Sequence, residues 1–157
     1  MKPVAQAEFS GNYAHNIDPK GRVTIPMAYR EALGDGFTIG LNNEFTAIAL
    51  YPVEKWQSMS RQLDRIPDSD AQGMAYVRLI KAFSFTNQSL DGQGRVLLPA
   101  VLREQAGMEK AIRFAGMGRW MEIWDEGRFA NAFMESVRDR SALLAYVNDR
   151  YFSPKDN

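Results

Sequence analysis

The sequence predicts an α+β fold built as a tandem duplication. Each copy is expected to supply a strand, a tight loop, a second strand, a short helix and a hairpin, with additional helices after it. Three observations support this prediction. Residues 18–34 (DPKGRVTIPMAYREALG) return 73 positions later, without a gap, as residues 91–107 (DGQGRVLLPAVLREQAG). Turn residues followed by β-branched or apolar residues open both copies, and apolar residues at helical spacing follow both.

The repeat extends beyond this motif. At the same shift of 73 positions, residues 48–56 show a weaker likeness to residues 121–129. We therefore place the first repeat and its trailing helices at residues 9–84, and the second repeat with a C-terminal helix at residues 85–151. The two repeats are expected to form one compact domain together, because a chain of 157 residues can bury one sizeable core.

Each copy begins with a strand and a turn. The β-prone stretches are residues 9–17 and 84–90, and the return strands begin with RVTI and RVLL. The Asp of each turn can accept backbone N–H bonds from residues that follow it, and the Gly tolerates a positive φ. Four residues are therefore expected to position the loops: Asp18, Gly21, Asp91 and Gly94.

A short helix follows each return strand. Pro26 and Pro99 suit the first position of a helix, and Gly34 and Gly107 suit its C-terminal stop. Residues 37–51 are then expected to form a further hairpin.

Longer helices are predicted after both copies. Residues 53–66 and 71–83 carry apolar residues at helical spacing, separated by the polar break PDSD. The apolar stripes face either the protein's own core or a neighbouring subunit, and the sequence leaves both alternatives open. After copy two the stripe comprises Phe129, Phe133, Val137, Leu144, Val147 and Tyr151.

Composition excludes several kinds of chemistry. The chain has no Cys, so it has neither a disulfide framework nor a cysteine nucleophile, and its single His argues against a histidine metal site. We expect no metal, no cofactor and no enzymatic activity. The N-terminus lacks the apolar region of a secretory signal and no apolar run could span a membrane, so we expect a cytoplasmic protein. Nineteen basic and nineteen acidic residues give a net charge of zero, which makes local charge the relevant quantity.

The motif resembles that of a known family. The pattern Asp-x-x-Gly-Arg-[Val/Leu]-x-[Ile/Leu]-Pro-x-x-x-Arg occurs twice, and Phe9 and Gly11 precede the first copy as Phe-x-Gly. This combination is similar to the MraZ family of transcriptional regulators, which is related to the AbrB-like swapped-hairpin DNA-binding proteins. The resemblance extends from about Phe9 to at least Phe129.

The resemblance implies both a fold and a function. The fold would be an interleaved β-barrel made of two AbrB-like halves. The function would be sequence-specific binding of double-stranded DNA through the repeated Asp-x-x-x-Arg loops, presented on a ring-shaped homo-oligomer. The family's target lies upstream of an operon of division and cell-wall genes, so the expected protein is a nucleoid-associated repressor that engages promoter repeats.

The physical chemistry of the loops agrees with this use. An arginine presents a planar fork of donors that fits phosphate oxygens or the O6/N7 edge of guanine. Copy two has Gln93 where copy one has Lys20, so the second loop is less basic. The expected DNA-binding residues are Lys20, Arg22, Gln93 and Arg95.

Two further arginines have an open interpretation. Arg30 and Arg103 lie in the short helices and would make either secondary phosphate contacts or ordinary solvated ion pairs. Asp18 and Asp91 are expected to brace the loops, because carboxylates repel phosphates. The spacing by itself would also fit a turn-closing salt bridge with no further role.

Two other functional classes are weighed against DNA binding. A structural or protein-interaction scaffold would use the repeat for assembly alone. An aspartic-type hydrolase would use one Asp from each repeat, but DPKG and DGQG lack the Ser or Thr that follows Asp in that motif. An Arg four residues downstream would also lower a carboxyl pKa, whereas the catalytic pair needs one raised.

Overall fold

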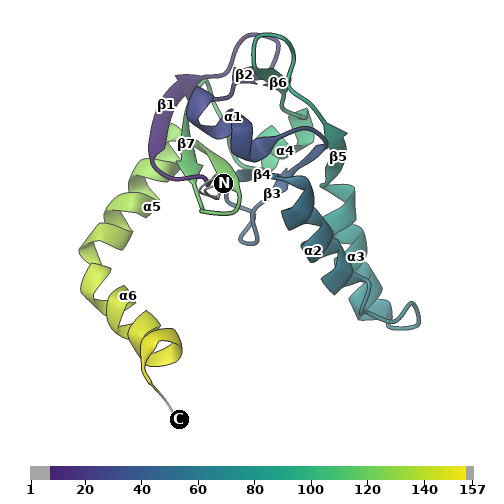
Figure 1. Cartoon of the computed structure of the whole chain (residues 1–157), viewed down its shortest axis with the longest axis vertical. Coiled ribbons are helices and arrows are strands. Elements are labelled where there is room, and N and C mark those ends of the chain that lie inside the picture. The colour runs from purple at the N-terminus through teal and green to yellow at the C-terminus, as the bar shows by residue number, and fades with distance from the viewer. Residues whose placement is uncertain (1–7, 155–157) are drawn as a thin grey trace, which may run out of the picture. The chain divides into compact units, whose positions relative to one another are not determined.

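The chain forms two compact units in the computed structural model, which describes residues 8–154. The first unit ends at Asp125 and the second begins at Glu126. Strands and helices together make up the first unit, which contains both copies of the repeated loop (Figure 1), so the predicted α+β class is confirmed. The strands are β1 (Asn12–Asn16), β2 (Arg22–Thr24), β3 (Phe37–Leu41), β4 (Ile48–Tyr51), β5 (Phe85–Gln88), β6 (Arg95–Leu97), β7 (Ala111–Gly116) and β8 (Met121–Asp125). The helices of this unit are α1 (Met27–Leu33), α2 (Val53–Leu63), α3 (Ala71–Ala82) and α4 (Ala100–Gln105).

Both sheets contain strands from the two copies. The larger sheet has six strands in the order β1-β7-β8-β4-β3-β5, and the smaller one is the antiparallel pair β2-β6. The first strand of copy one, β1, pairs with β7 of copy two, and the first strand of copy two, β5, pairs with β3 of copy one. Neither copy could therefore complete its sheet alone. Closure of this arrangement into a barrel stays a prediction.

An approximate two-fold axis relates the copies. In the small sheet Val23 lies opposite Val96, and in the large sheet Ala49 lies opposite Glu122. Both are pairs of equivalent positions in the repeat, because each is separated by the same 73 residues that separate the motifs. The axis thus passes through the centres of β2-β6 and β4-β8, and it relates the two loops to each other.

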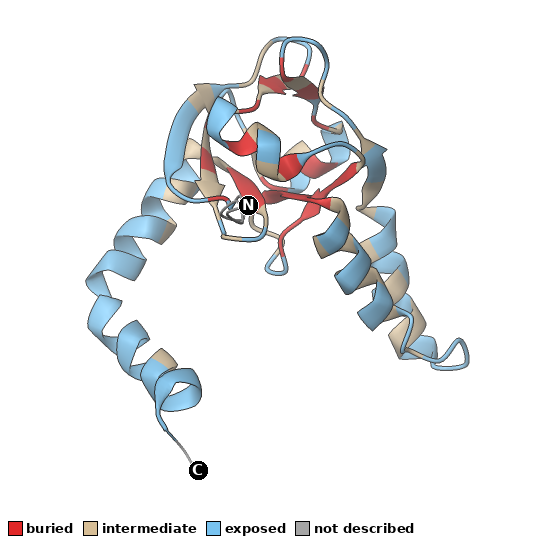
Figure 2. Cartoon of the chain, in the orientation of Figure 1, coloured by how far each residue is buried: buried red, intermediate tan, exposed pale blue. Residues whose placement is uncertain are grey.

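The core lies between the sheets and the short helices. Figure 2 shows the buried positions concentrated in the strands and on one side of α1. Ile25 and Leu98, which follow β2 and β6, are fully buried, as are Tyr29 of α1 and Leu102 of α4. Burial of such side chains contributes about 1.5–3 kcal/mol each, and it anchors the base of both loops to a packed interior.

The predicted helix boundaries hold with small differences. Pro26 and Pro99 each stand one residue before the first helical residue, with φ near the value that proline imposes. Gly34 ends α1 at a φ of 64°. Copy two differs because α4 ends at Gln105, before Gly107 is reached.

Helices α2 and α3 occupy the segments expected for them. Pro52 precedes α2, and the side chain of Asp70 caps α3 by accepting a hydrogen bond of 2.9 Å from the backbone N–H of Gly73. Neither helix contains a buried residue.

The second unit consists of helical turns. The predicted stripe is interrupted at Asp139, whose φ of −94° and ψ of 12° leave the helical range. No residue among 126–154 is buried, although the rings of Phe129 and Phe133 stack with centroids 5.4 Å apart. None of the helices in residues 8–154 combines the length and apolar character that crossing a bilayer requires. The elements are α5 (Glu126–Arg138), α6 (Arg140–Val147) and a π-helical turn, η1 (Asn148–Phe152).

Candidate nucleic-acid interface

Asp18 organises the first loop through hydrogen bonds to the residues that follow it. Its Oδ1 accepts from the backbone N–H of Lys20 at 2.9 Å and from that of Arg22 at 2.8 Å. Its Oδ2 accepts from Arg22 Nε at 2.8 Å, which completes the ion pair. The predicted pairing of Asp with Arg is therefore present.

The second loop repeats this geometry. Asp91 Oδ1 accepts from the backbone N–H groups of Gln93 and Arg95, both at 2.9 Å, and its Oδ2 accepts from Arg95 Nε at 2.9 Å. The exchange of Lys20 for Gln93 leaves the loop unaltered, because the residue contributes only its backbone N–H to the turn. Tight loops of one conformation thus lie at both ends of the β2-β6 ribbon.

These contacts also act on the carboxyl groups. Hydrogen bonding from the backbone N–H of Arg22 is the largest influence on Asp18, and it lowers the pKa of that carboxyl below its ordinary value. The backbone N–H of Arg95 lowers the pKa of Asp91 in the same way. Both groups are consequently charged at neutral pH, as an ion pair with arginine requires.

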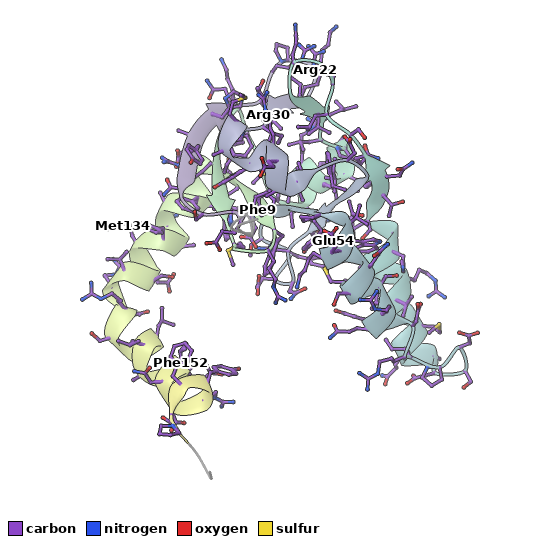
Figure 3. All side chains as sticks on the ribbon, viewed as in Figure 1. Phe9, Arg22, Arg30, Glu54, Met134 and Phe152 are labelled. Carbon is purple, nitrogen blue, oxygen red and sulfur yellow. The ribbon has the colours of Figure 1, made fainter. Side chains whose placement is uncertain are left out.

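The pleat of the ribbon sends the two arginines to its outer face. Val23 and Val96 at its centre are buried, so their neighbours along each strand point away from the core. Arg22 and Arg95 are among these neighbours, and Figure 3 shows Arg22 at the loop end of the first unit. The hydrogen bonds to the aspartates come from Nε, and within residues 8–154 the Nη groups of Arg22 and Arg95 make no hydrogen bond, which leaves them available as donors.

Leu97 was not predicted from the sequence as part of this surface. It stands on the same outer face, opposite Arg22, and is 55% exposed. Its equivalent in copy one is Thr24, which lies opposite Arg95. The signal that could have found it is strand alternation, since Val96 is the inward residue and Leu97 must then face outward.

Arg30 and Arg103 lie against the loops of the opposite copy. Arg30 Nε donates to the carbonyl of Ile25 at 2.9 Å, and Arg103 Nε donates to that of Leu98 at 3.0 Å. A Cβ at Gly21 would lie 3.0 Å from Arg103 Nη2, and one at Gly94 would clash with the Arg30 guanidinium. Both side chains are half-buried, and their role as phosphate contacts stays a prediction.

A cavity of about 460 Å³ is present elsewhere in the first unit. Its lining includes Tyr51, Trp56, Trp120 and Glu122. The Glu122 carboxylate accepts from the indole N–H of Trp124 at 2.9 Å and from that of Trp120 at 3.3 Å. Burial raises the pKa of Glu122. The residue was not singled out from the sequence, and its equivalent in copy one is Ala49.

Ligands for a metal ion do not converge in the described part of the chain. Among residues 8–154, no three His, Asp or Glu side chains are placed to hold an ion. The aspartates of the two loops are instead held by arginine and by backbone N–H groups.

Comparison with known proteins identifies the family. A sequence profile described as "MraZ protein, putative antitoxin-like" matches residues 9–78 and 84–145. The chain is 36% identical over 144 residues to the transcriptional regulator MraZ of Acetivibrio thermocellus, covering 87% of this chain and 98% of that protein. It is 38% identical over 143 residues to the transcriptional regulator MraZ of Moorella thermoacetica, covering 90% of this chain and 97% of that protein. The chain therefore belongs to the MraZ family.

Proposed function

We propose that the protein is a sequence-specific DNA-binding transcriptional regulator that reads DNA with the outer face of the β2-β6 ribbon. One observation carries the proposal: Arg22 and Arg95 lie on one face of one ribbon, each with its Nε fixed by an aspartate and its Nη groups available. The names of the family's relatives support the same class of function.

The dimensions of the ribbon suit the major groove. Arg22 and Arg95 are two residues apart along the ribbon, which corresponds to about 7 Å. A two-stranded ribbon fits the major groove, where each guanidinium can bind O6 and N7 of a guanine and contribute ~1–3 kcal/mol of discrimination. The exposed side chain of Leu97 suits contact with a thymine methyl group.

Charge alone would make a single protomer a weak binder. The net charge is zero, so attraction to phosphates comes from local groups such as Lys20. We propose a ring-shaped homo-oligomer that engages several promoter repeats at once, because linked sites raise the effective concentration. The exposed apolar side chains of the second unit, such as Phe133, Leu144 and Tyr151, support self-association.

The proposed biological role follows from this arrangement. An oligomer bound over promoter repeats upstream of division and cell-wall genes would obstruct polymerase and repress transcription. Such a protein would act in the cytoplasm at the nucleoid. Within the first unit, the pairing of strands from both copies suggests that the strands of the 9–84 repeat and those of the 85–151 repeat act as one DNA-binding body rather than as two independent readers.

The test is binding of the full chain to duplex DNA from upstream of its own gene, measured by fluorescence anisotropy in a salt series. Replacing both Arg22 and Arg95 by Ala is expected to weaken binding by at least about 30-fold, since each bidentate contact contributes ~1–3 kcal/mol. Arg61→Ala is a matched control, because Arg61 is an exposed arginine on α2. A scrambled duplex separates specific from general attraction.

Each result has a definite meaning for the proposal. Preferential binding that falls steeply with salt and is lost only in the double variant supports it. Equal binding by the double variant would instead favour the scaffold alternative, with the loops as a structural feature. Size-exclusion chromatography of the same variants distinguishes the two, because a scaffold whose loops mediate assembly would change its oligomeric state.

A further inference from the structure

We infer that each loop is held in place by an arginine of the opposite copy, so that Arg103 positions the Asp18–Arg22 loop and Arg30 positions the Asp91–Arg95 loop. The importance of these two arginines for DNA binding rests on the proposed function, because the loops that they position are the proposed DNA contacts. The structural part of the inference can be tested without DNA.

The contacts around the first loop form a closed circuit. The carbonyl of Gly21 accepts a hydrogen bond of 2.9 Å from the backbone N–H of Leu98. The carbonyl of Leu98 in turn accepts from Arg103 Nε at 3.0 Å, and the guanidinium of Arg103 lies against Gly21. Since Leu98 is fully buried, this circuit ties the loop to the core of the other copy.

The second loop is held by the equivalent circuit. Gly94 accepts a hydrogen bond of 2.9 Å from the backbone N–H of Ile25, whose carbonyl accepts from Arg30 Nε at 2.9 Å. The guanidinium of Arg30 lies so close to Gly94 that a Cβ there would clash with it. Figure 3 shows Arg30 on α1, below the loop that carries Arg22. The contact therefore crosses from helix α1 of copy one to the loop of copy two.

The glycines explain why an arginine is needed there. Gly21 and Gly94 have φ values of 87° and 77° and are buried, although they belong to loops. A planar guanidinium can pack against the backbone of a glycine, which has no side chain, while its Nε donates a hydrogen bond to a backbone carbonyl of its own copy. No ion pair within residues 8–154 engages Arg30 or Arg103, so the contact with the glycine is not a by-product of charge pairing.

The contact between the arginine of one copy and the loop of the other copy is a consequence of how β2 and β6 pair. Because β2 and β6 are antiparallel, the start of each strand lies beside the end of the other, and the short helix that follows each strand reaches the other copy's loop. A substitution in the helix of one copy should accordingly disturb the loop of the other copy. A role confined to phosphate contact predicts no such pattern.

The first test is amide hydrogen exchange of the full chain without DNA. In Arg103→Ala, exchange at the backbone N–H groups of Leu98 and Gly21 is expected to rise by about tenfold, since both report the first loop, whereas Ile25 and Gly94 stay protected. Arg30→Ala should give the mirror result. Arg61→Ala serves as the surface control. Increases confined to the loop of the same copy, or no increase at either loop, would overturn the inference.

The second test is a set of double-substitution cycles on DNA binding. Loss of binding in Arg103→Ala is expected to depend on Arg22 with a coupling on the order of tenfold, and to be additive with loss of Arg95. Arg30→Ala should couple to Arg95 and not to Arg22. Coupling of Arg103 with Arg95 or of Arg30 with Arg22, or no coupling at all, would contradict the inference. If Arg22 and Arg95 prove irrelevant to DNA, the proposed function fails, while the exchange result still decides the positioning role.

A conservative substitution distinguishes a positioning role of Arg103 from an effect of its charge, and it is less disruptive to the fold than a change to Ala. Arg103→Lys keeps the positive charge but lacks the planar cover. If Arg103 positions the loop, the variant still shows raised exchange at Gly21 and weakened binding. If Arg103 only attracts phosphate, Arg103→Lys binds like the parent protein with an unchanged salt slope, and the inference is rejected.

Discussion

The two ends of the approximate two-fold axis have diverged to different extents. At the β2-β6 end, Val23 meets Val96, and the loops on either side have the same hydrogen bonds to within about a tenth of an ångström. At the β4-β8 end, Ala49 meets Glu122, a buried carboxyl that only one copy possesses. The duplication is therefore retained in detail at the two loops, which are the proposed DNA contacts, and it has been lost at the centre of the β4-β8 pair. At the centre of β4-β8 the two equivalent side chains pack in one shared place, so they can differ from each other.

Removing the asymmetric carboxyl should give the largest change in stability. Glu122→Ala leaves the indole N–H groups of Trp120 and Trp124 without their acceptor, so the free energy of unfolding should fall by ~1–3 kcal/mol. DNA binding should not change, because the loops lie at the other end of the axis. Urea unfolding and anisotropy measure the two quantities.

The same substitution carries a pH signature. Burial raises the pKa of Glu122 above 4.5, so stabilisation by this group is complete below that value and is lost as pH rises through the raised pKa. The gap in stability between parent and Glu122→Ala should therefore be wider at pH 4 than at pH 7. Glu104→Ala, at an exposed position, is the control. A gap that widens with pH would contradict the assigned cause.

A glycine pair sharpens the comparison at the loop end. Gly94 and Gly34 both have positive φ, but a Cβ at Gly34 meets nothing within 4 Å, whereas one at Gly94 displaces the Arg30 guanidinium. Gly34→Ala and Gly94→Ala should each lose about 1–2 kcal/mol of stability from backbone strain. Only Gly94→Ala should also weaken DNA binding. Equal binding by both variants would show that the guanidinium's place is unimportant.

The exchange of Lys20 in the first loop for Gln93 in the second should have the smallest effect on DNA binding. Gln93→Lys gives the second loop the charge of the first, and binding should tighten about two- to fivefold, with a salt slope steeper by ~0.9 for one added phosphate contact. Lys20→Gln is the matched opposite and should weaken binding by a similar factor. If neither substitution alters the slope, these side chains do not approach phosphate.

Local chemistry explains why much of the site could be predicted. Asp18 and Arg22 lie four residues apart, so the turn that joins them depends on hydrogen bonds within a few residues of chain. Proline and glycine signals bracketed α1 for the same reason, because they restrict or free the backbone of a single residue. The helices α2 and α3 followed from apolar spacing and the polar break between them.

The duplication, the conformation expected of each loop and most of the helices could therefore be predicted from the order of the residues. Three features became visible only in the folded chain: β1 pairs with β7, Arg103 and Arg30 each contact the glycine of the other copy's loop, and Glu122 is buried. The cause is the distance along the chain over which each interaction acts. Turn chemistry and periodicity act between neighbouring residues, whereas these contacts join positions in different copies whose partners are chosen by how the two halves pack together.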